Sequence, residues 1–435
     1  MKKNEIYTLT CLDDTRLGSG IVKVDNQVVF VPNLLIGEVA KIKIVKVNKN
    51  YAYGRIEEII KKSDFRKEAE CAHARICGGC SYQHIQYKEQ LRIKERQMKD
   101  LFGRNVDESI DVLPVIGCED SFYYRNKAQF PVRVENNEVK MGFYRNHSND
   151  IVPCKECMIQ SHEINEIYKY IQSKLTPDMA NGLRHIFIRV SYYTKEGQVV
   201  FIGASEKRLL PLVNDLKSKF HIVSILFNYN TRNDNVIIGE KYKVLYGRDF
   251  IYEQCLGLKI QLHFKSFFQV NPIQMEKLYQ CAIEMAELDG HQTCIDLYAG
   301  TGTIGLSIAS KANYVTGVEI VPEAVTNANE NAKINAISNY TCICMDASAF
   351  AAKHKNEKID VLFVDPPRKG MSEQGINDIL TMSPDTIIYV SCNPETLFRD
   401  LKLFQENGYH CLKIQPVDMF AQTLGLENIA KLVKL

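Results

Sequence analysis

The chain has 435 residues, enough for two or three domains, and 45% of them are hydrophobic, as in ordinary globular proteins. Its net charge of +2 is unevenly spread, because residues 1–104 carry 20 Lys or Arg against 13 Asp or Glu, and a basic segment favours contact with a polyanion. No apolar run reaches membrane-spanning length and no signal-peptide core follows the polar start, so we expect a cytoplasmic protein with no membrane partner, whose 14 cysteines serve metal binding or catalysis rather than disulfides.

Residues 1–62 contain short β-branched stretches separated by Gly, Asn and Asp turns, a pattern that predicts a small OB-like β-barrel. The stretch 39–47 alternates apolar residues with lysines, among them Lys41 and Lys43, and Tyr51 and Tyr53 follow it. Basic side chains interleaved with aromatic ones are typical of barrels that hold single-stranded RNA. The alternative is a barrel whose charged face only meets solvent.

Three cysteines follow the barrel within ten residues, at Cys71, Cys77 and Cys80, and two glycines separate the last pair. Closely spaced thiolates on a chain that glycines allow to fold back predict three ligands of a zinc ion or an iron–sulfur cluster. The candidates for the fourth ligand are His73 and His84, for zinc, and Cys154 and Cys157, for an iron–sulfur cluster.

A central α+β domain is expected over residues 71–260. It begins with a charged amphipathic helix over 85–104, whose apolar face offers a surface for packing on the C-terminal domain. Strand signals then predict an antiparallel sheet at 132–134, 139–143, 186–193, 198–203 and 221–228. Ahead of these strands lie residues that either contact RNA or belong to the core, namely Tyr123, Tyr124, Arg125 and Lys127.

From about residue 261 strand and helix patterns alternate, which predicts a doubly wound, Rossmann-like α/β domain over 261–435. A strand there runs into Gly300-x-Gly302-x-x-Gly305, a spacing that lets the backbone approach a nucleoside ligand closely. The next strand ends in Glu319, where an acid can hydrogen-bond ribose hydroxyls. This fingerprint suits NAD as well as S-adenosylmethionine, but no hydride acceptor is evident in the sequence.

Two later strands of this domain end in chemically reactive residues. The apolar run 361–364 leads into Asp365-Pro-Pro-Arg368, and the run 387–390 leads into Ser-Cys392-Asn-Pro. Because the carboxyl ends of parallel strands meet at one edge of a sheet, the acid, the arginine and the cysteine should converge on one cleft. The alternative for Cys392 is the usual one for a free cysteine, a small buried hydrophobe.

These features resemble the RNA uracil-5-methyltransferases, which use S-adenosylmethionine, and residues 1–62 resemble the TRAM RNA-binding module. The resemblance rests on the two strand-end motifs, the cysteine spacing, Gly18-Ser19-Gly20, Phe268-Gln269-Val270-Asn271 and Asp296-Leu297-Tyr298. It covers nearly the whole chain. Because the TRAM-like segment and the cysteine spacing occur in ribosomal RNA members, the resemblance implies 23S ribosomal RNA as the partner, with transfer RNA as the alternative.

The resemblance also implies a reaction and a set of site residues. Cys392 would add to C6 of uracil so that C5 can take the methyl group, and Glu427 would then remove the proton from C5. The target base would have to leave its stack to reach the cleft. The residues implied around S-adenosylmethionine and the uracil edge are Gln269, Tyr298, Gly300, Gly302, Glu319, Asp346 and Asp365. Those implied for a 4Fe-4S cluster, zinc being the alternative, are Cys71, Cys77, Cys80 and Cys157.

The C-terminal loop departs from the family pattern, because Ala421 stands in place of a proline and Gly425 in place of a histidine, although Glu427 keeps its position. A catalytically silent RNA-binding or ribosome-assembly protein therefore stays open as an alternative. An amino-methylating enzyme is disfavoured because Arg368 follows the Asp-Pro-Pro sequence where such enzymes have an aromatic residue. A radical methylthio-transferase is disfavoured because five residues, not three, separate the first two cysteines. We expect a monomer with no obligate protein partner.

Overall fold

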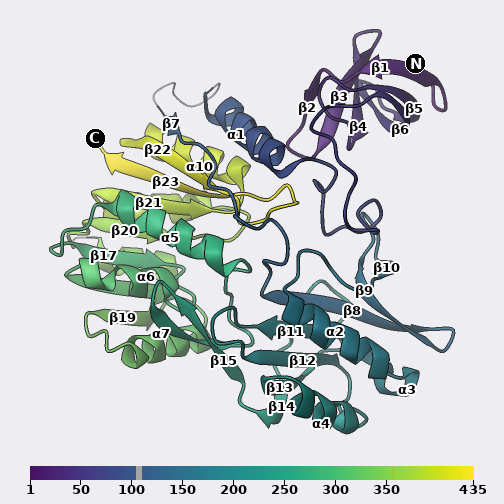
Figure 1. Cartoon of the computed structure of the whole chain (residues 1–435). Helices are drawn as coiled ribbons and strands as arrows, with labels where there is room; N and C mark the ends of the chain where they lie inside the picture. The colour runs from purple at the N-terminus through teal and green to yellow at the C-terminus, as the bar shows by residue number, and fades with distance from the viewer. Residues whose placement is uncertain (104–109, 356) are drawn as a thin grey trace.

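The computed structural model describes residues 1–103, 110–355 and 357–435. The described chain is organised around three large sheets, each with apolar residues packed against it. Figure 1 shows the N-terminal sheet at the top right, the central sheet at the bottom right and the C-terminal sheet on the left. A short fourth sheet is a hairpin of β15 (Phe250–Cys255) and β16 (Leu258–His263).

The N-terminal sheet contains six strands in the order β1-β5-β6-β4-β3-β2 and packs around one apolar core. Along β5 the burial alternates as the sequence predicts, with Ala40, Ile42 and Ile44 buried and Lys41 exposed. The strands are β1 (Ile6–Thr10), β2 (Asp13–Asp14), β3 (Ser19–Val24), β4 (Gln27–Pro32), β5 (Val39–Val47) and β6 (Tyr51–Lys61).

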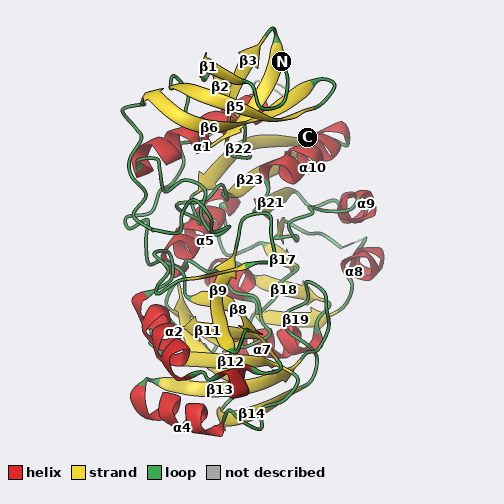
Figure 2. Ribbon diagram, turned by 90° about the vertical axis from the view of Figure 1, so that its right-hand side faces the viewer, coloured by secondary structure: helices red, strands yellow, loops and turns green. Residues whose placement is uncertain are grey.

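The central sheet has seven strands in the order β10-β9-β8-β11-β12-β13-β14, antiparallel except for the β12–β13 pair. Its helices pack on one face, as Figure 2 shows for α2 and α4. The elements are β8 (Lys127–Glu135), β9 (Glu138–Tyr144), β10 (Ile151–Pro153), α2 (His162–Lys174), α3 (Pro177–Ala180), β11 (Leu183–Val190), β12 (Gly197–Gly203), α4 (Leu210–Lys219), β13 (Ile222–Tyr229) and β14 (Tyr242–Gly247).

The C-terminal sheet has eight strands in the order β19-β18-β17-β20-β21-β23-β22-β7. The first five are mutually parallel, and β23 runs antiparallel to β21. Helices cover both faces, so two apolar clusters flank the sheet and the domain is doubly wound, as the alternating pattern predicts. The strands are β7 (Asp111–Val112), β17 (Thr293–Leu297), β18 (Tyr314–Glu319), β19 (Tyr340–Cys344), β20 (Val361–Val364), β21 (Thr386–Ser391), β22 (Tyr409–Val417) and β23 (Glu427–Lys434). The helices between them are α5 (Pro272–Ala286), α6 (Thr303–Ile308), η1 (Ala309–Lys311), α7 (Pro322–Ile334), α8 (Ala347–His354), α9 (Glu373–Met382) and α10 (Pro394–Glu406).

Three segments that lie wholly or mostly in the range 71–260, where a central domain is expected, pack on the C-terminal sheet, and for the first of them, a helix, the apolar face predicts this packing. Helix α1 (Tyr87–Gly103) buries Met98 and Phe102 against it, and β7 (Asp111–Val112) extends its edge beside β22. The hairpin β15–β16 joins the core on the other face. Of these segments, β7 covers the edge of β22, which would otherwise expose unpaired backbone groups. Residue 104, the end of the expected helix, lies outside the described residues. In the part of the chain that is described, no helix is both long and apolar enough to cross a membrane.

Candidate active site

Cys392 lies in the short turn that joins β21 to α10, at the carboxyl edge of the C-terminal sheet. The Ser391 hydroxyl accepts a hydrogen bond from the Asn393 backbone N–H (3.2 Å), and the Asn393 side chain caps α10 by accepting from the Glu395 N–H (3.1 Å). Both contacts hold the turn from either side of Cys392, whose side chain is half-buried. The cysteine is therefore held at a strand end rather than sealed in the core.

The turn after β20 meets the turn after β21, as the sequence predicts. The Asn393 side-chain amide donates to the carbonyl of Arg368 at 3.2 Å, which ties the Asp365–Arg368 turn to the cysteine. Asp365 and Arg368 are both close enough to Cys392 to change its pKa. The acid, the arginine and the cysteine therefore share one edge of the sheet.

A second carboxyl group reaches Cys392 from the opposite strand. Ser391 pairs with Asn428 across the β21–β23 ladder, and the Asn428 amide donates to the Ser391 carbonyl at 3.2 Å. Glu427, the first residue of β23, therefore lies beside Cys392. The register of an antiparallel pair, which no local pattern reveals, brings these two residues together.

Burial and charge make the thiol of Cys392 weakly acidic. Its pKa is raised to about 11, first by burial and then by the charges of Glu427 and Asp365, while Arg368 acts in the opposite direction. Burial also raises the pKa of Asp365 to about 7. The pKa of Glu427 lies well above its ordinary value, first because of burial and then because of Asp365. Within the described chain, Glu427 Oε2 is buried without a hydrogen-bond partner, so this carboxyl group is free to exchange a proton with a bound molecule.

The glycine loop after β17 forms a ligand cradle next to Glu319. Oε2 of Glu319 accepts from the Gly300 N–H at 3.0 Å, and Oε1 accepts from the two following backbone N–H groups at 2.9 Å. Tyr298 and Gly300 have positive φ angles of 64° and 56°. A Cβ at Gly300 would meet no protein atom within 4 Å, so this position has space for a ligand.

Glycine is needed at position 302 for a different physical reason from the close approach of a ligand that the sequence suggests. A Cβ there would lie 2.6 Å from the Tyr340 hydroxyl, so packing of Tyr340 beneath the loop requires glycine. Asp346, at the N-terminus of α8, accepts from the Ser348 N–H at 2.9 Å and thus also serves as a helix cap. Gln269 is buried just before α5, and its carbonyl accepts from the Asn126 amide at 3.3 Å.

The cysteines of the expected cluster approach one another from two parts of the chain. Cys80 and Cys157 contact the same small apolar cluster, and the thiols of Cys71 and Cys77 lie near enough to raise the pKa of Cys80 slightly beyond the effect of burial. The Gly79 N–H donates to Cys77 Sγ at 3.4 Å, a contact that suits a thiolate ligand. Among the described residues, however, no three Cys, His, Asp or Glu side chains stand close enough to hold a metal ion. The cluster ligands stay a prediction.

The contact between the cysteine-rich segment and the C-terminal loop was not expected from the sequence. The backbone N–H groups of Ser81 and Tyr82 both donate to the Gln422 carbonyl at 3.0 Å. The Gln90 and Gln422 side chains are hydrogen-bonded at 2.9 Å, and Lys94 forms a buried ion pair with Asp418 at 2.7 Å. One feature of the sequence could have indicated this contact: Gln90 and Lys94 lie four residues apart, on the same face of α1 as its apolar residues.

Family and structural comparisons agree with this arrangement. Residues 86–434 match the family described as tRNA (Uracil-5-)-methyltransferase, and residues 2–56 match the TRAM domain. An uncharacterized RNA methyltransferase of Oceanobacillus iheyensis is 40% identical over 99% of this chain and 97% of its own length. Another, of Staphylococcus epidermidis, is 41% identical over 100% of this chain and 98% of its own. The crystal structure of Pyrococcus abyssi tRNA (uracil-54, C5)-methyltransferase with S-adenosyl-L-homocysteine matches with a TM-score of 0.75 and 24% identity, over 98% of this chain and 100% of that one.

The family matches thus define a methyltransferase with a TRAM domain at its N-terminus, and the doubly wound sheet has the fold of that class of enzyme. More particularly, the chain belongs to the RNA uracil-5-methyltransferase family, and the resemblance that its motifs suggest is confirmed.

Proposed function

We propose that the protein methylates C5 of a uridine in 23S ribosomal RNA, through a covalent bond between Cys392 and uracil, and gives 5-methyluridine. The observation that supports this reaction is the placement of Cys392 between the carboxyl groups of Glu427 and Asp365. The same placement disfavours a silent RNA-binding protein, because two buried carboxyl groups beside a thiol cost stability without serving the fold.

The reaction uses these residues in a defined order. S-adenosylmethionine supplies an electrophilic methyl group. Cys392 loses its proton to solvent and adds to C6 of uracil as the thiolate. This makes C5 nucleophilic, and C5 takes the methyl group while S-adenosylhomocysteine leaves. The carboxylate of Glu427 then accepts the proton from C5, and Sγ leaves C6 as the ring double bond re-forms. The high pKa of Glu427 makes its carboxylate a strong acceptor for that proton.

The cofactor would lie along the carboxyl edge from β19 to β20, at the point where the strand order reverses. Its nucleoside would be held by Tyr298, Gly300 and Glu319. The residues proposed around it and the uracil edge are Gln269, Tyr298, Gly300, Gly302, Glu319, Asp346 and Asp365. Of these, Gly300 has the best support, since open space lies over it.

Single-stranded RNA as the partner is supported by an aromatic patch on the N-terminal sheet. The rings of Phe30, Tyr51 and Tyr53 lie together, with centroids 5.8 Å apart for Phe30 and Tyr51 and 5.6 Å apart for the two tyrosines. Both tyrosines are about 40% exposed. Lysines of β5 lie beside this patch, and exposed rings next to positive charge suit stacking of unpaired bases. The patch therefore favours an unpaired loop of ribosomal or transfer RNA, rather than an RNA duplex, as the partner of this sheet.

For the cysteines we propose a 4Fe-4S cluster held by Cys71, Cys77, Cys80 and Cys157, with zinc as the alternative. The donor set supports it, because all four groups are thiols and Cys157 is near Cys80 in the same apolar cluster. The cluster would stabilise the segment that hydrogen-bonds to the C-terminal loop.

We further propose three domains, at residues 1–62, 71–260 and 261–435, except that α1, β7 and the hairpin β15–β16 pack on the C-terminal domain. The enzyme would be a cytoplasmic monomer without a membrane partner or an obligate protein partner.

A covalent trap tests the reaction and the substrate together. The protein is mixed with S-adenosylmethionine and a 23S ribosomal RNA transcript that contains 5-fluorouridine. Fluorine at C5 cannot leave as a proton, so we expect the RNA to stay attached to Cys392 and to migrate as a slower band on a denaturing gel. Mapping the attachment would identify the uridine.

The Cys392→Ala variant and a 5-fluorouridine transfer RNA transcript serve as controls for the trap. The variant should give no band while it still binds RNA. A band with transfer RNA alone would overturn the ribosomal assignment and keep the reaction. Normal methylation by the variant would overturn the role of Cys392.

A further inference from the structure

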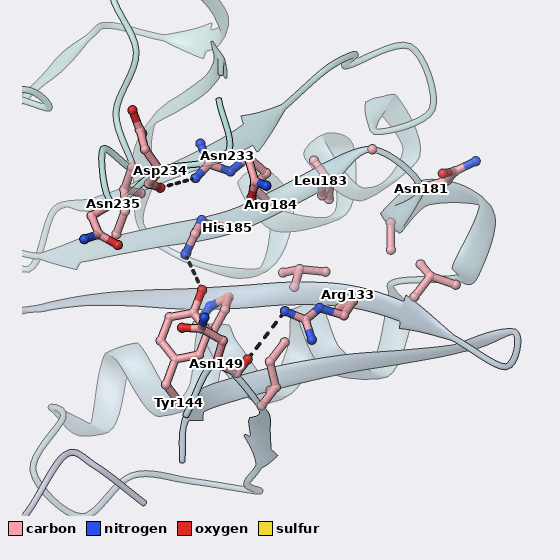
Figure 3. A pocket seen from close by; sticks show the side chains of 17 residues that line it. Arg133, Tyr144, Asn149, Asn181, Leu183, Arg184, His185, Asn233, Asp234 and Asn235 are labelled. Carbon is pink, nitrogen blue, oxygen red and sulfur yellow. Dashed lines mark hydrogen bonds between the residues drawn. The ribbon is translucent and has the colours of Figure 1, made fainter. Parts of the chain in front are cut away.

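A cavity lies on the central sheet, and none of the family-motif residues line it. It has a volume of about 620 Å³, within the range of about 300–1,000 Å³ for ligand sites. Figure 3 shows its side chains, which come from β8, β9, β10, β11, the end of α3 and the loops that contain Asn149, Asn181 and residues 233–237. Residues such as Arg133 and His185 alternate with the core residues that face α2 and α4, so the cavity opens on the face away from those helices.

The lining combines an aromatic ring, two guanidinium groups and several side-chain amides. Tyr144 is 39% exposed, and Arg133 reaches the cavity with a half-exposed side chain. The amides belong to Asn149, Asn181, Asn233 and Asn235. Such a set can stack a flat ring, hydrogen-bond its edge and neutralise a phosphate, whereas it suits an apolar ligand poorly.

His185 gives the cavity a fixed polar group. Its side chain is only 6% exposed, and its Nε2 lies 3.2 Å from the Tyr144 hydroxyl. Its Nδ1 is buried with no hydrogen-bond partner in the described chain. Burial lowers the pKa of the ring to about 4, so the imidazole is neutral at pH 7 and can offer a donor or an acceptor to a base.

The opposite wall is held in place by hydrogen bonds to its backbone. Arg184 donates to the carbonyls of Asp234 (2.9 Å) and Val236 (3.3 Å), and Asn230 donates to those of Val236 (2.8 Å) and Ile237 (2.9 Å). Carbonyls that are satisfied in this way keep the loop 233–237 folded over the sheet. The cavity is therefore a shaped site rather than a gap beneath a loose loop.

We propose that this cavity binds a ribonucleotide, with the base on Tyr144 and His185 and the phosphate on Arg133. The inference builds on the proposed function, because the RNA substrate would supply this nucleotide from a position outside the target uridine. The Tyr144 carbonyl accepts from the Gly78 N–H at 3.0 Å, so the cavity adjoins the cysteine-rich segment that also reaches the C-terminal loop. An RNA strand held here and at the catalytic edge would be fixed at two points.

Two substitutions test the site by RNA affinity and by steady-state kinetics. Tyr144→Ala and Arg133→Gln should each raise the Kd for the 23S transcript about tenfold, the effect expected from loss of one stacked base or one phosphate contact. They should raise KM by the same factor and leave kcat within about twofold, because neither residue touches the reacting atoms. Tyr144→Phe keeps the ring and should bind RNA like the unchanged protein, which distinguishes stacking from misfolding.

The matched control is Lys169→Gln, which removes a positive charge from α2 on the other face of the same sheet. It should change neither Kd nor KM.

A titration of the unchanged protein with adenosine monophosphate, followed by calorimetry, tests whether the ligand of the cavity is a free nucleotide or part of an RNA strand. Suppose that adenosine monophosphate binds the unchanged protein but not Tyr144→Ala, while the two proteins bind RNA equally well. The ligand of the cavity would then be a free nucleotide and not an RNA strand. Equal RNA affinity without such binding would overturn the site. If the unchanged protein makes no 5-methyluridine, the proposed function fails while the affinity comparison still tests the cavity.

Discussion

Cys392 shares the edge of its sheet with two carboxyl groups that oppose its ionisation and one arginine that favours it. This balance leaves the thiol protonated in the free protein at neutral pH, since its pKa is about 11. A protonated thiol is a weak nucleophile, so Cys392 should react slowly with alkylating reagents at neutral pH.

We therefore expect alkylation of Cys392 by iodoacetamide to accelerate about tenfold per pH unit between pH 7 and 9, because only the thiolate reacts. Arg368→Gln should slow it several-fold at each pH, since the arginine lowers the pKa of the thiol. Mass spectrometry of the Cys392 peptide measures the rate. The exposed Cys344 provides the internal reference and should react equally in both proteins. An unchanged rate at Cys392 would contradict the electrostatic role of Arg368.

Asp365 should reduce stability at high pH. Burial raises its pKa from 3.8 to about 7, so the folded protein binds its proton more tightly than the unfolded chain does. The resulting cost grows as pH rises from about 4 to about 7 and reaches at most about 4 kcal/mol. Asp365→Asn should therefore raise Tm at pH 8 and leave it unchanged at pH 4, as calorimetry can measure.

Asp360, at the other end of β20 from Asp365, should instead stabilise the protein at high pH. Its carboxylate pairs with Lys358 and accepts from the Thr293 N–H at 2.8 Å, and these contacts keep its pKa below the ordinary value. Stability from this group is present above pH 4 and is lost as pH falls. Asp360→Asn should therefore lower Tm at pH 8. A rise in Tm for both variants would contradict this assignment of the two carboxyl groups.

At the scale of elements, the C-terminal loop before β23 is built around its departures from the family pattern. Ala421 is fully buried against Tyr124, whose hydroxyl donates to the Ala421 carbonyl at 2.9 Å. The Gly425 carbonyl accepts from Lys94 at 2.8 Å. The loop thus has its own partners in place of the usual proline and histidine, and it delivers Glu427 to the edge of the sheet.

Gly425→Ala should distort this loop. The added Cβ would lie 2.7 Å from a ring carbon of Phe420, so we expect a loss of about 1–3 kcal/mol in the free energy of unfolding and a lower kcat. Urea denaturation and methyl-transfer assays measure the two effects. The control is Gly103→Ala at the end of α1, where a Cβ meets no atom within 4 Å and stability should hold or rise. Equal effects of the two substitutions would contradict the packing argument.

At the scale of the whole molecule, α1 connects the front of the chain to its end. Its Lys94 and the Asp418 carboxylate are both buried, at 2% and 0% exposure, although 324 positions separate them. Tyr87 donates to the other Asp418 oxygen at 2.8 Å. A buried pair that keeps both charges hydrogen-bonded favours one arrangement of helix and loop over alternatives.

Lys94→Met should leave Asp418 buried and unpaired and so lower the free energy of unfolding by about 3–5 kcal/mol. Urea denaturation gives the value. Lys99→Met is the matched substitution on the same helix, because Lys99 pairs with Glu95 at 2.6 Å but is 54% exposed. Its cost should stay below about 1 kcal/mol. A similar cost for both would show that Lys94 contributes only as an ordinary surface charge.

Local patterns predicted the doubly wound sheet, the alternating N-terminal strands and the strand-end positions of Asp365 and Cys392. These features depend on the spacing of neighbouring residues, which is what fixes the 2.0 and 3.6 periods of strands and helices. The family motifs extended this to the reaction class. The sequence by itself therefore determined the type of domain, the edge of the sheet at which Asp365 and Cys392 lie, and the class of enzyme.

Only the tertiary structure decided which distant segments meet. It paired Ser391 with Asn428 and so brought Glu427 to Cys392, and it buried Lys94 against the C-terminal loop. It assigned Gly302 to the packing of Tyr340 and opened a polar cavity on the central sheet. Such contacts depend on strand register and domain packing, which join residues hundreds of positions apart and leave no periodic trace in the chain.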